Sequence, residues 1–140
     1  MDTHSLESQL NQLWASVIEG FSVDLCAHTI SMDIRTKQDD NVEYRVVFGG
    51  VSSFYFVGGE SDERFNRPPW DYAELSEVYF YSQDVHRISH RFAQKPGFAQ
   101  YGSSANFVLE MWSSCLFVEA SSVVINDSRF DVGYPRISVE

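Results

Sequence analysis

The chain has 140 residues and a mass of 16.0 kDa, the length of one domain, and 44% of its residues are hydrophobic and 21% charged. This composition argues against a disordered, collagen-like or coiled-coil protein. Twenty acidic and ten basic residues give a formal charge of −10, which disfavours nucleic acid or an anionic membrane as the main partner, because phosphate binding requires clustered Lys and Arg. The charge is compatible with a basic protein partner.

The first twenty residues predict an amphipathic helix (1–20). The apolar residues that recur with helical spacing are Leu6, Leu10, Leu13, Trp14, Val17 and Ile18. Gly20 stands where such a helix would end. We expect the helix to pack on one face of a sheet through Leu6, Leu10, Leu13, Trp14 and Val17. The segment lacks the basic start and the apolar stretch of a secretory signal, and no part of the chain has the roughly 18 consecutive apolar residues of a membrane-spanning helix.

After residue 20 the hydrophobic period changes from that of a helix to that of a strand. The phase of the apolar residues then changes near His28 and Thr29, so we expect a β-bulge or a strand break there. A polar turn at 38–41 predicts a hairpin. Two pairs of glycines interrupt the pattern on either side of a short strand at 54–56.

The second half of the chain predicts a surface loop at 60–72, strands at 73–81, 106–112 and 116–125, and an irregular excursion at 82–104. The last of these strands is long enough to bend or bulge, and the tail, 126–140, is polar. We therefore predict a single α+β domain over residues 1–140. Its N-terminal amphipathic helix would pack on a mainly antiparallel β-sheet or partly open barrel formed by residues 21–125.

The two cysteines, Cys26 and Cys115, are far apart and have no Cys-x-x-Cys spacing. We expect two buried thiols in a reducing cytoplasm, with a disulfide between them as the alternative. Cys26 and His28 would share one strand face, but neither a cation nor a helix N-terminus lies nearby in the sequence to activate the thiol. The sequence thus predicts a cytoplasmic protein in which Cys26 belongs to the core.

No constellation of residues predicts a metal site, a cofactor or a catalytic centre. His86 and His90 have the spacing of zinc ligands on a helix, but the arginine that follows each of them would repel the cation. A nucleophile elbow and a phosphate-binding loop are both missing from the sequence. Glu110 and Glu119 lie in strand patterns that could pair, and we expect both side chains to point to solvent.

Acidic and aromatic residues crowd the stretch from residue 60 to residue 77. The candidate partner-binding residues are Glu60, Asp62, Glu63, Phe65, Trp70, Asp71, Tyr72 and Glu74. Acidic side chains steer a basic partner and aromatic side chains supply desolvated anchors, so this stretch is a candidate recognition surface. The alternative is a solvated loop whose aromatic residues fold back onto the sheet.

Two other classes of function stay open. The first is a small-ligand-binding or enzymatic β-domain with a pocket lined by Tyr44, Tyr79, Tyr81 and Trp112. The second is a structural subunit that forms a homodimer through a sheet edge.

The order of segments after the first helix resembles that of a known family. The matching stretches are SVDLC at 22–26, ISMDI at 30–34, YRVVFGGVSSF at 44–54, AELSEV at 73–78, FVLEMW at 107–112 and LFVEA at 116–120. This arrangement resembles the YxiG-like and immunity-protein-50-like small bacterial proteins over most of residues 8–126. The resemblance implies a non-enzymatic protein of a bacterial toxin–immunity locus, without catalytic residues. We therefore expect an acidic protein-binding domain that neutralises a toxin.

Overall fold

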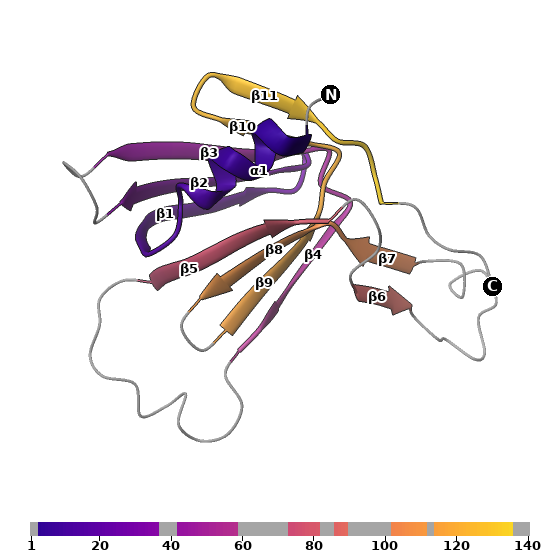
Figure 1. Ribbon diagram of the computed structural model, residues 1–140. Coiled ribbons are helices and arrows are strands. Elements are labelled where there is room, and N and C mark those ends of the chain that lie inside the picture. Colours follow the sequence, from indigo (N-terminus) through magenta and orange to yellow (C-terminus); the bar gives the residue numbers. More distant parts are fainter. Residues whose placement is uncertain are drawn as a thin grey trace, which may run out of the picture.

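The computed structural model describes residues 3–36, 42–58, 73–81, 86–89, 102–111 and 114–135. In these parts the elements are α1 (Thr3–Asn11), β1 (Ser16–Asp24), β2 (Thr29–Thr36), β3 (Glu43–Gly49), β4 (Ser53–Val57), β5 (Ala73–Phe80), β6 (His86–Ser89), β7 (Gly102–Ala105), β8 (Phe107–Met111), β9 (Ser114–Glu119), β10 (Ser122–Ile125) and β11 (Ser128–Asp131). The predicted combination of one N-terminal helix and a mainly antiparallel sheet is confirmed (Figure 1).

Nine of the strands form one sheet in the order β11-β10-β3-β2-β1-β5-β8-β9-β4, and β6 pairs with β7. Every pair between these described strands is antiparallel. The end strands β11 and β4 are not neighbours in the described ladder, so the sheet is open and the predicted barrel is not confirmed.

The long sheet bends so that its two halves share one core. The rings of Phe48 on β3 and Phe107 on β8 are 4.9 Å apart, although three strands separate β3 from β8 in the sheet. Figure 1 shows β1, β2, β3, β10 and β11 as one layer and β4, β5, β8 and β9 as the other. Apolar residues of both layers and of α1 belong to a single buried cluster, which is the arrangement expected of a two-layer domain.

Two short links carry the chain from one layer to the other, side by side. The β3–β4 link passes the β9–β10 link, with the Ser121 amide donating to the Gly49 carbonyl at 3.1 Å and the Ser52 amide donating to the Glu119 carbonyl at 3.0 Å. Gly50 has a φ of 60° in the first link, a conformation that glycine adopts without strain. The expected bend in 116–125 is therefore confirmed, as the corner between β9 and β10.

The N-terminal helix is shorter than predicted. It ends at Asn11, and β1 begins at Ser16. The structure buries Leu6 and Leu10 from the helix and Leu13 from the turn that follows, but Trp14 is 52% exposed. The packing role predicted for Trp14 is wrong. Val17 is buried as predicted, but it belongs to β1.

Tertiary pairing explains this correction. Val17 and Ile18 suit a strand because their β-branched side chains have restricted rotamers. Both lie between two partner strands, β2 and β5. Gly20 does not end a helix. It follows a register shift in β1, and an added Cβ there would lie 2.9 Å from a carboxylate oxygen of Asp33.

The change in phase of the apolar residues near His28 corresponds to a break between two strands, which was one of the two predicted alternatives. Residues 25–28 form the turn between β1 and β2, and the Asp24 carboxylate accepts hydrogen bonds from the backbone amides of Cys26 and Ala27, each at 3.0 Å. Cys26 is exposed, Cys115 is half-buried, and both are free thiols. The expectations of two buried thiols and of a core Cys26 are therefore wrong, and the alternative disulfide is not formed.

Three strands, β6, β7 and β11, lie in segments for which the sequence pattern predicted no strand. The excursion at 82–104 contributes β6 and most of β7, and the polar tail contributes β11, which pairs with β10. His86 lies on β6, so the helical spacing that suggested a zinc site does not apply there; His90 lies outside the described residues. In the described parts, no helix is long and apolar enough to cross a membrane.

Candidate binding face

Two glutamates face each other across neighbouring strands. Glu77 on β5 is directly opposite Glu110 on β8, and both side chains are exposed. A register shift between Leu75 and Glu77 sets this arrangement. Residues two apart in a regular strand share a face, but the shift leaves Leu75 fully buried and turns Glu77 to the outside.

Tyr79 lies next to the two carboxylates. Its hydroxyl donates a short hydrogen bond to Glu77 Oε2 and lies 3.3 Å from Glu110 Oε2. The hydrogen bond to Glu77, with burial and the negative charges of both glutamates, raises the pKa of Tyr79 above its ordinary value. The tyrosine therefore keeps its proton and serves as a donor at neutral pH. Its ring lies 6.0 Å from that of Tyr81, which is also exposed.

The face continues onto β9. Cys115 is directly opposite Glu110, and cross-strand partners share a face of the sheet. Burial and the nearby charge of Glu110 raise the pKa of Cys115, so the thiol stays protonated and is a poor nucleophile. We call the surface formed by Glu77, Tyr79, Tyr81, Glu110 and Cys115 the carboxylate face.

The aromatic neighbours of this face extend it toward the edge of the sheet. Phe117 on β9 stacks on Tyr55 of β4, with ring centroids 4.7 Å apart and ring planes inclined by 12°. Burial is the main cause that raises the pKa of Tyr55. This part of the outer face is therefore aromatic, whereas the β5–β8 part carries the carboxylates.

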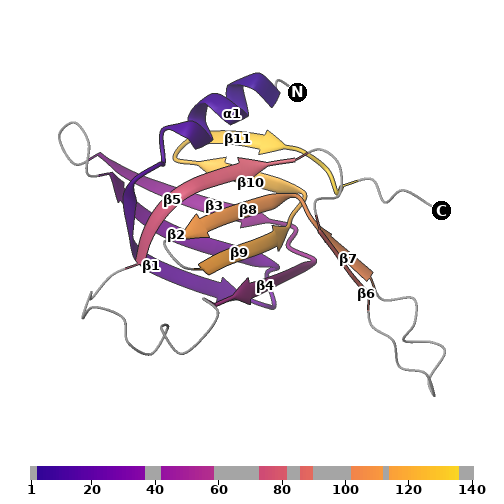
Figure 2. The same cartoon turned by 60° about the horizontal axis from the view of Figure 1, so that its bottom comes forward.

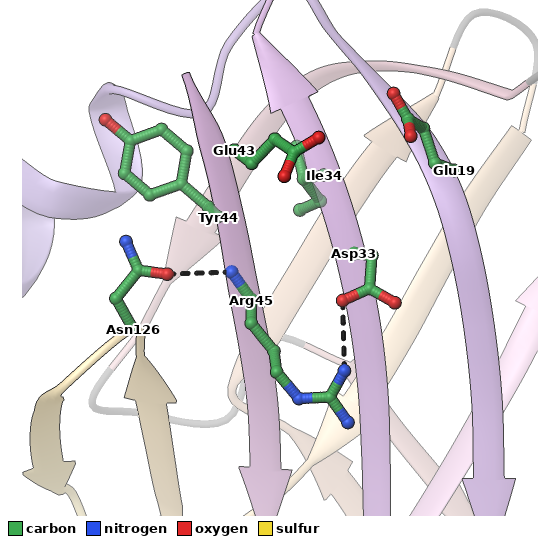
Figure 3. Close-up of a pocket in the computed structure, with 7 residues that line it drawn as sticks. All are labelled: Glu19, Asp33, Ile34, Glu43, Tyr44, Arg45 and Asn126. Carbon is green, nitrogen blue, oxygen red and sulfur yellow. Dashed lines mark hydrogen bonds and ion pairs between the residues drawn. The ribbon is translucent and has the colours of Figure 1, made fainter.

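A second polar region lies on the outer side of β1, β2 and β3 (Figure 3). It is an open depression of about 530 Å³ that includes Asp33, Arg45 and Asn126. Arg45 binds Asp33 at 3.0 Å, and the amide oxygen of Asn126 accepts the Arg45 backbone N–H at 2.9 Å. A second ion pair joins Arg35 and Glu19. Opposite charges thus pair within this region.

The two regions differ in their cross-strand charge pairing. On β2 and β3, Asp33 is opposite Arg45, and Arg35 is opposite Glu43. On β5 and β8 the opposite residues are both glutamates, and neither forms an ion pair with a cation in the parts of the chain that the structure describes. Opposite charges at such positions stabilise a sheet and like charges destabilise it. Among the described residues, the carboxylate face therefore carries a cross-strand pair of like charges that no described cation neutralises.

Most of the partner-binding residues predicted from the sequence cannot be placed on this face. Glu60, Asp62, Glu63, Phe65, Trp70, Asp71 and Tyr72 lie outside the described residues. The backbone of Glu74 pairs with Val17 at the start of β5. Their role in binding stays a prediction.

The predicted aromatic pocket is not assembled by the tyrosines that the structure describes. Tyr44 packs against the core, and its hydroxyl donates to Gln12 Oε1 at 3.3 Å. Tyr79 lies on the outer face, beside Tyr81. Trp112 is outside the described residues. Two of the four residues are therefore neighbours, and Tyr44 belongs to a different surface.

Of the two glutamates predicted to point to solvent, Glu110 and Glu119, only the first does so. Glu110 is exposed, as predicted, but Glu119 is only 9% exposed and accepts a short hydrogen bond from the Ser52 hydroxyl. Its carboxylate belongs to the corner between the layers, so the solvent-facing prediction for Glu119 is wrong. Among the described His, Cys, Asp and Glu residues, no three are grouped as metal ligands.

Comparison with known proteins gives one family. The sequence model of the YxiG-like protein family matches residues 6–130. This match confirms the YxiG-like resemblance, and the immunity-protein-50-like resemblance stays a prediction. No curated protein matches the chain.

Proposed function

The chain belongs to the YxiG-like family, and we propose that it acts without catalysis, by binding a basic protein on the carboxylate face. The observation that carries the proposal is the cross-strand pair of Glu77 and Glu110. Like charges in this position reduce stability by roughly 0.2–1 kcal/mol. A partner's Lys or Arg between the two carboxylates would remove this repulsion on binding.

The rest of the surface supports the same kind of partner. The formal charge of −10 attracts basic proteins over long distances and increases their association rate. Tyr79 and Tyr81 add two aromatic rings beside the carboxylates, and tyrosine is enriched among residues that dominate binding energy. A specific interface needs both features, because charges steer the encounter and buried aromatic contacts slow dissociation.

The finer proposal is that the protein is a cytoplasmic immunity protein that neutralises a bacterial toxin. Its support is the acidic charge together with the resemblance to immunity-protein-50-like proteins. An acidic protein of this kind would cover a basic surface of the toxin. The homodimer alternative is less favourable on the carboxylate face, because a two-fold interface brings identical patches together and would place four glutamates in contact.

The test compares the binding kinetics of variants with a basic candidate partner, to be sought as a toxin domain encoded beside the gene. Substituting Glu77→Gln together with Glu110→Gln should lower the association rate most at low salt, where charges are least screened. The matched control is Glu7→Gln with Glu43→Gln, which makes the same change in net charge at exposed positions on α1 and β3. Equal losses in both double variants would show that only net charge matters and would contradict the proposed face.

The stretch at 60–74 needs its own variants, because it is a separate candidate surface. Replacing Glu60, Asp62 and Glu63 by their amides should reduce the association rate, and Trp70→Ala should increase the dissociation rate if this stretch contacts the partner. Normal kinetics in both variants would leave the carboxylate face as the contact surface.

A further inference from the structure

An open depression lies beside the carboxylate face, between α1 and β5. It has a volume of about 360 Å³ and is lined by Leu10, Asn11, Trp14, Glu77 and Val78. β5 pairs with β1 only near its start, where Ala73–Leu75 meet Ser16–Ile18, and α1 packs against β5 (Figure 2). The depression therefore occupies the junction of the helix with the outer part of β5.

Trp14 is the exposed aromatic wall of this depression. Its neighbours Leu13 and Ser16 are fully buried, while Trp14 is 52% exposed. Ala15 has a φ of 54° and donates its amide to the Ser76 carbonyl at 3.3 Å. The backbone on both sides of Trp14 is thus fixed to the core and to β5, and this directs the indole outward.

Glu77 joins the depression to the carboxylate face, because it lines the first and faces Glu110 in the second. The depression is therefore lined by the aromatic Trp14, the apolar Leu10 and Val78, and the acidic Glu77. Glu77 forms no ion pair with the residues that the structure describes. Charge complementarity selects a cationic occupant. An arginine side chain fits best, because its planar guanidinium stacks on an indole and hydrogen-bonds a carboxylate at the same time.

We propose that the depression between α1 and β5 binds an arginine side chain of the basic partner, stacked on Trp14 and hydrogen-bonded to Glu77. This assignment rests on the proposed function, and it specifies which residue of the partner is recognised. Trp14 is the anchor of the contact, and Glu110 provides the second carboxylate for a neighbouring basic residue in the same segment.

The test uses a hexa-arginine peptide as the probe and full-length protein labelled with 5-fluorotryptophan. The Trp14 fluorine signal is assigned by its loss in Trp14→Phe. We expect this signal to shift saturably on titration, with Glu77→Gln weakening the peptide affinity roughly threefold to fivefold, the scale of one exposed ion pair. Glu43→Gln, which makes the same charge change on β3, should leave the affinity within about twofold because charge at a distance is screened. A hexa-lysine peptide should shift the signal less, since an ammonium group stacks less well on an indole.

Backbone amide signals of β5 and β8, recorded in the same titration, separate the two proposals. Shifts in β5 and β8 without a shift of Trp14 would overturn the arginine site but support binding at the carboxylate face. Absence of shifts both at Trp14 and in β5 and β8 would overturn both. Equal weakening by Glu77→Gln and Glu43→Gln would also overturn the site, because it would show attraction by net charge alone.

Discussion

The structure of the turn that follows α1, in which Leu13 is buried and Trp14 is exposed, can be tested by replacing each of the two residues with Ala. Leu13 is fully buried in the cluster shared by both layers, whereas Trp14 is 52% exposed. Buried Leu→Ala substitutions cost about 2–5 kcal/mol through lost burial and the remaining cavity. We expect about 3–4 kcal/mol for Leu13→Ala, because its surroundings combine helix and sheet residues that cannot all move to close the cavity.

Trp14→Ala should cost less, although it removes more atoms. About half of a tryptophan surface of roughly 200 Å² is buried here, which corresponds to about 2.5 kcal/mol at 25 cal/mol per Å². Part of that area is also buried in the unfolded chain, and Ala retains some contact, so about 1–1.5 kcal/mol remains. For a domain of this length the expected fall in Tm is roughly 10 °C for Leu13→Ala and 4 °C for Trp14→Ala.

The assay is urea unfolding followed by far-ultraviolet circular dichroism, which does not depend on tryptophan fluorescence. An unchanged dependence of the unfolding free energy on urea would show that both variants unfold between the same states. If Trp14→Ala cost as much as Leu13→Ala, at about 3 kcal/mol or more, the Trp14 side chain would belong to the core, which would contradict its exposure in the turn after α1.

Three other outcomes are expected. Because the pKa of Tyr79 is raised, the folded protein retains a proton that the unfolded chain releases near pH 10. The free energy of unfolding should therefore fall as pH rises above about 10, and Tyr79→Phe should reduce that fall. Cys26 is exposed and Cys115 is half-buried with a raised pKa, so brief iodoacetamide treatment should modify Cys26 first; mass spectrometry showing equal rates would contradict this. Gly133→Ala should cost about 1–2 kcal/mol through positive φ alone, and Gly50→Ala should cost more because its new Cβ would also collide with the Ser121 hydroxyl. Equal unfolding free energies of the two variants would refute this contact.

Local sequence signals were sufficient where one short segment determines its own structure. The alternation in residues 43–49, 53–57 and 73–80 marks strands, and in 43–49 and 73–80 one face of the strand contributes to the core. The glycines between the first two strands also mark the link that crosses between layers. These features depend on side-chain period and on turn chemistry, both of which are visible in a single segment.

Local signals failed where a distant partner decides between two structures. Val17 and Ile18 continue the helical period of the preceding apolar residues, but pairing with Arg35, Ile34 and residues of β5 selects the strand. The polar sequence of β11 likewise depends on β10, which supplies its pairing. Propensity is a weak signal at such positions because tertiary contacts outweigh it.

For the same reason, the sequence predicted the exposure of one glutamate of the carboxylate face but not its pairing with the other. Glu110 could be expected at the surface from its own strand pattern. Its pairing with Glu77 depends on the β5–β8 register and on the shift after Leu75, and neither follows from counting alternate residues. The exposure of Trp14 depends on where α1 ends, which the helical period of residues 6–18 concealed.

The like-charge pair also predicts a conflict between stability and binding. Glu110→Gln removes the repulsion with Glu77 while leaving an amide oxygen near Tyr79, so it should stabilise the free protein by about 0.2–1 kcal/mol. The contrasting control is Glu43→Gln, which removes a carboxylate opposite Arg35 and should be neutral or destabilising. Both effects should shrink in roughly 1 M salt, where charges are screened within about 3 Å.

Urea unfolding of the two variants at low and high salt measures this difference, and partner or peptide binding measures its functional counterpart. A gain in stability together with weaker binding is expected only if Glu110 is retained for recognition, because a residue that served folding would not improve stability when its charge is removed. A loss of stability in Glu110→Gln at low salt would show that the two glutamates are compensated in the folded protein, and it would remove the main argument for a cation-binding surface on β5 and β8.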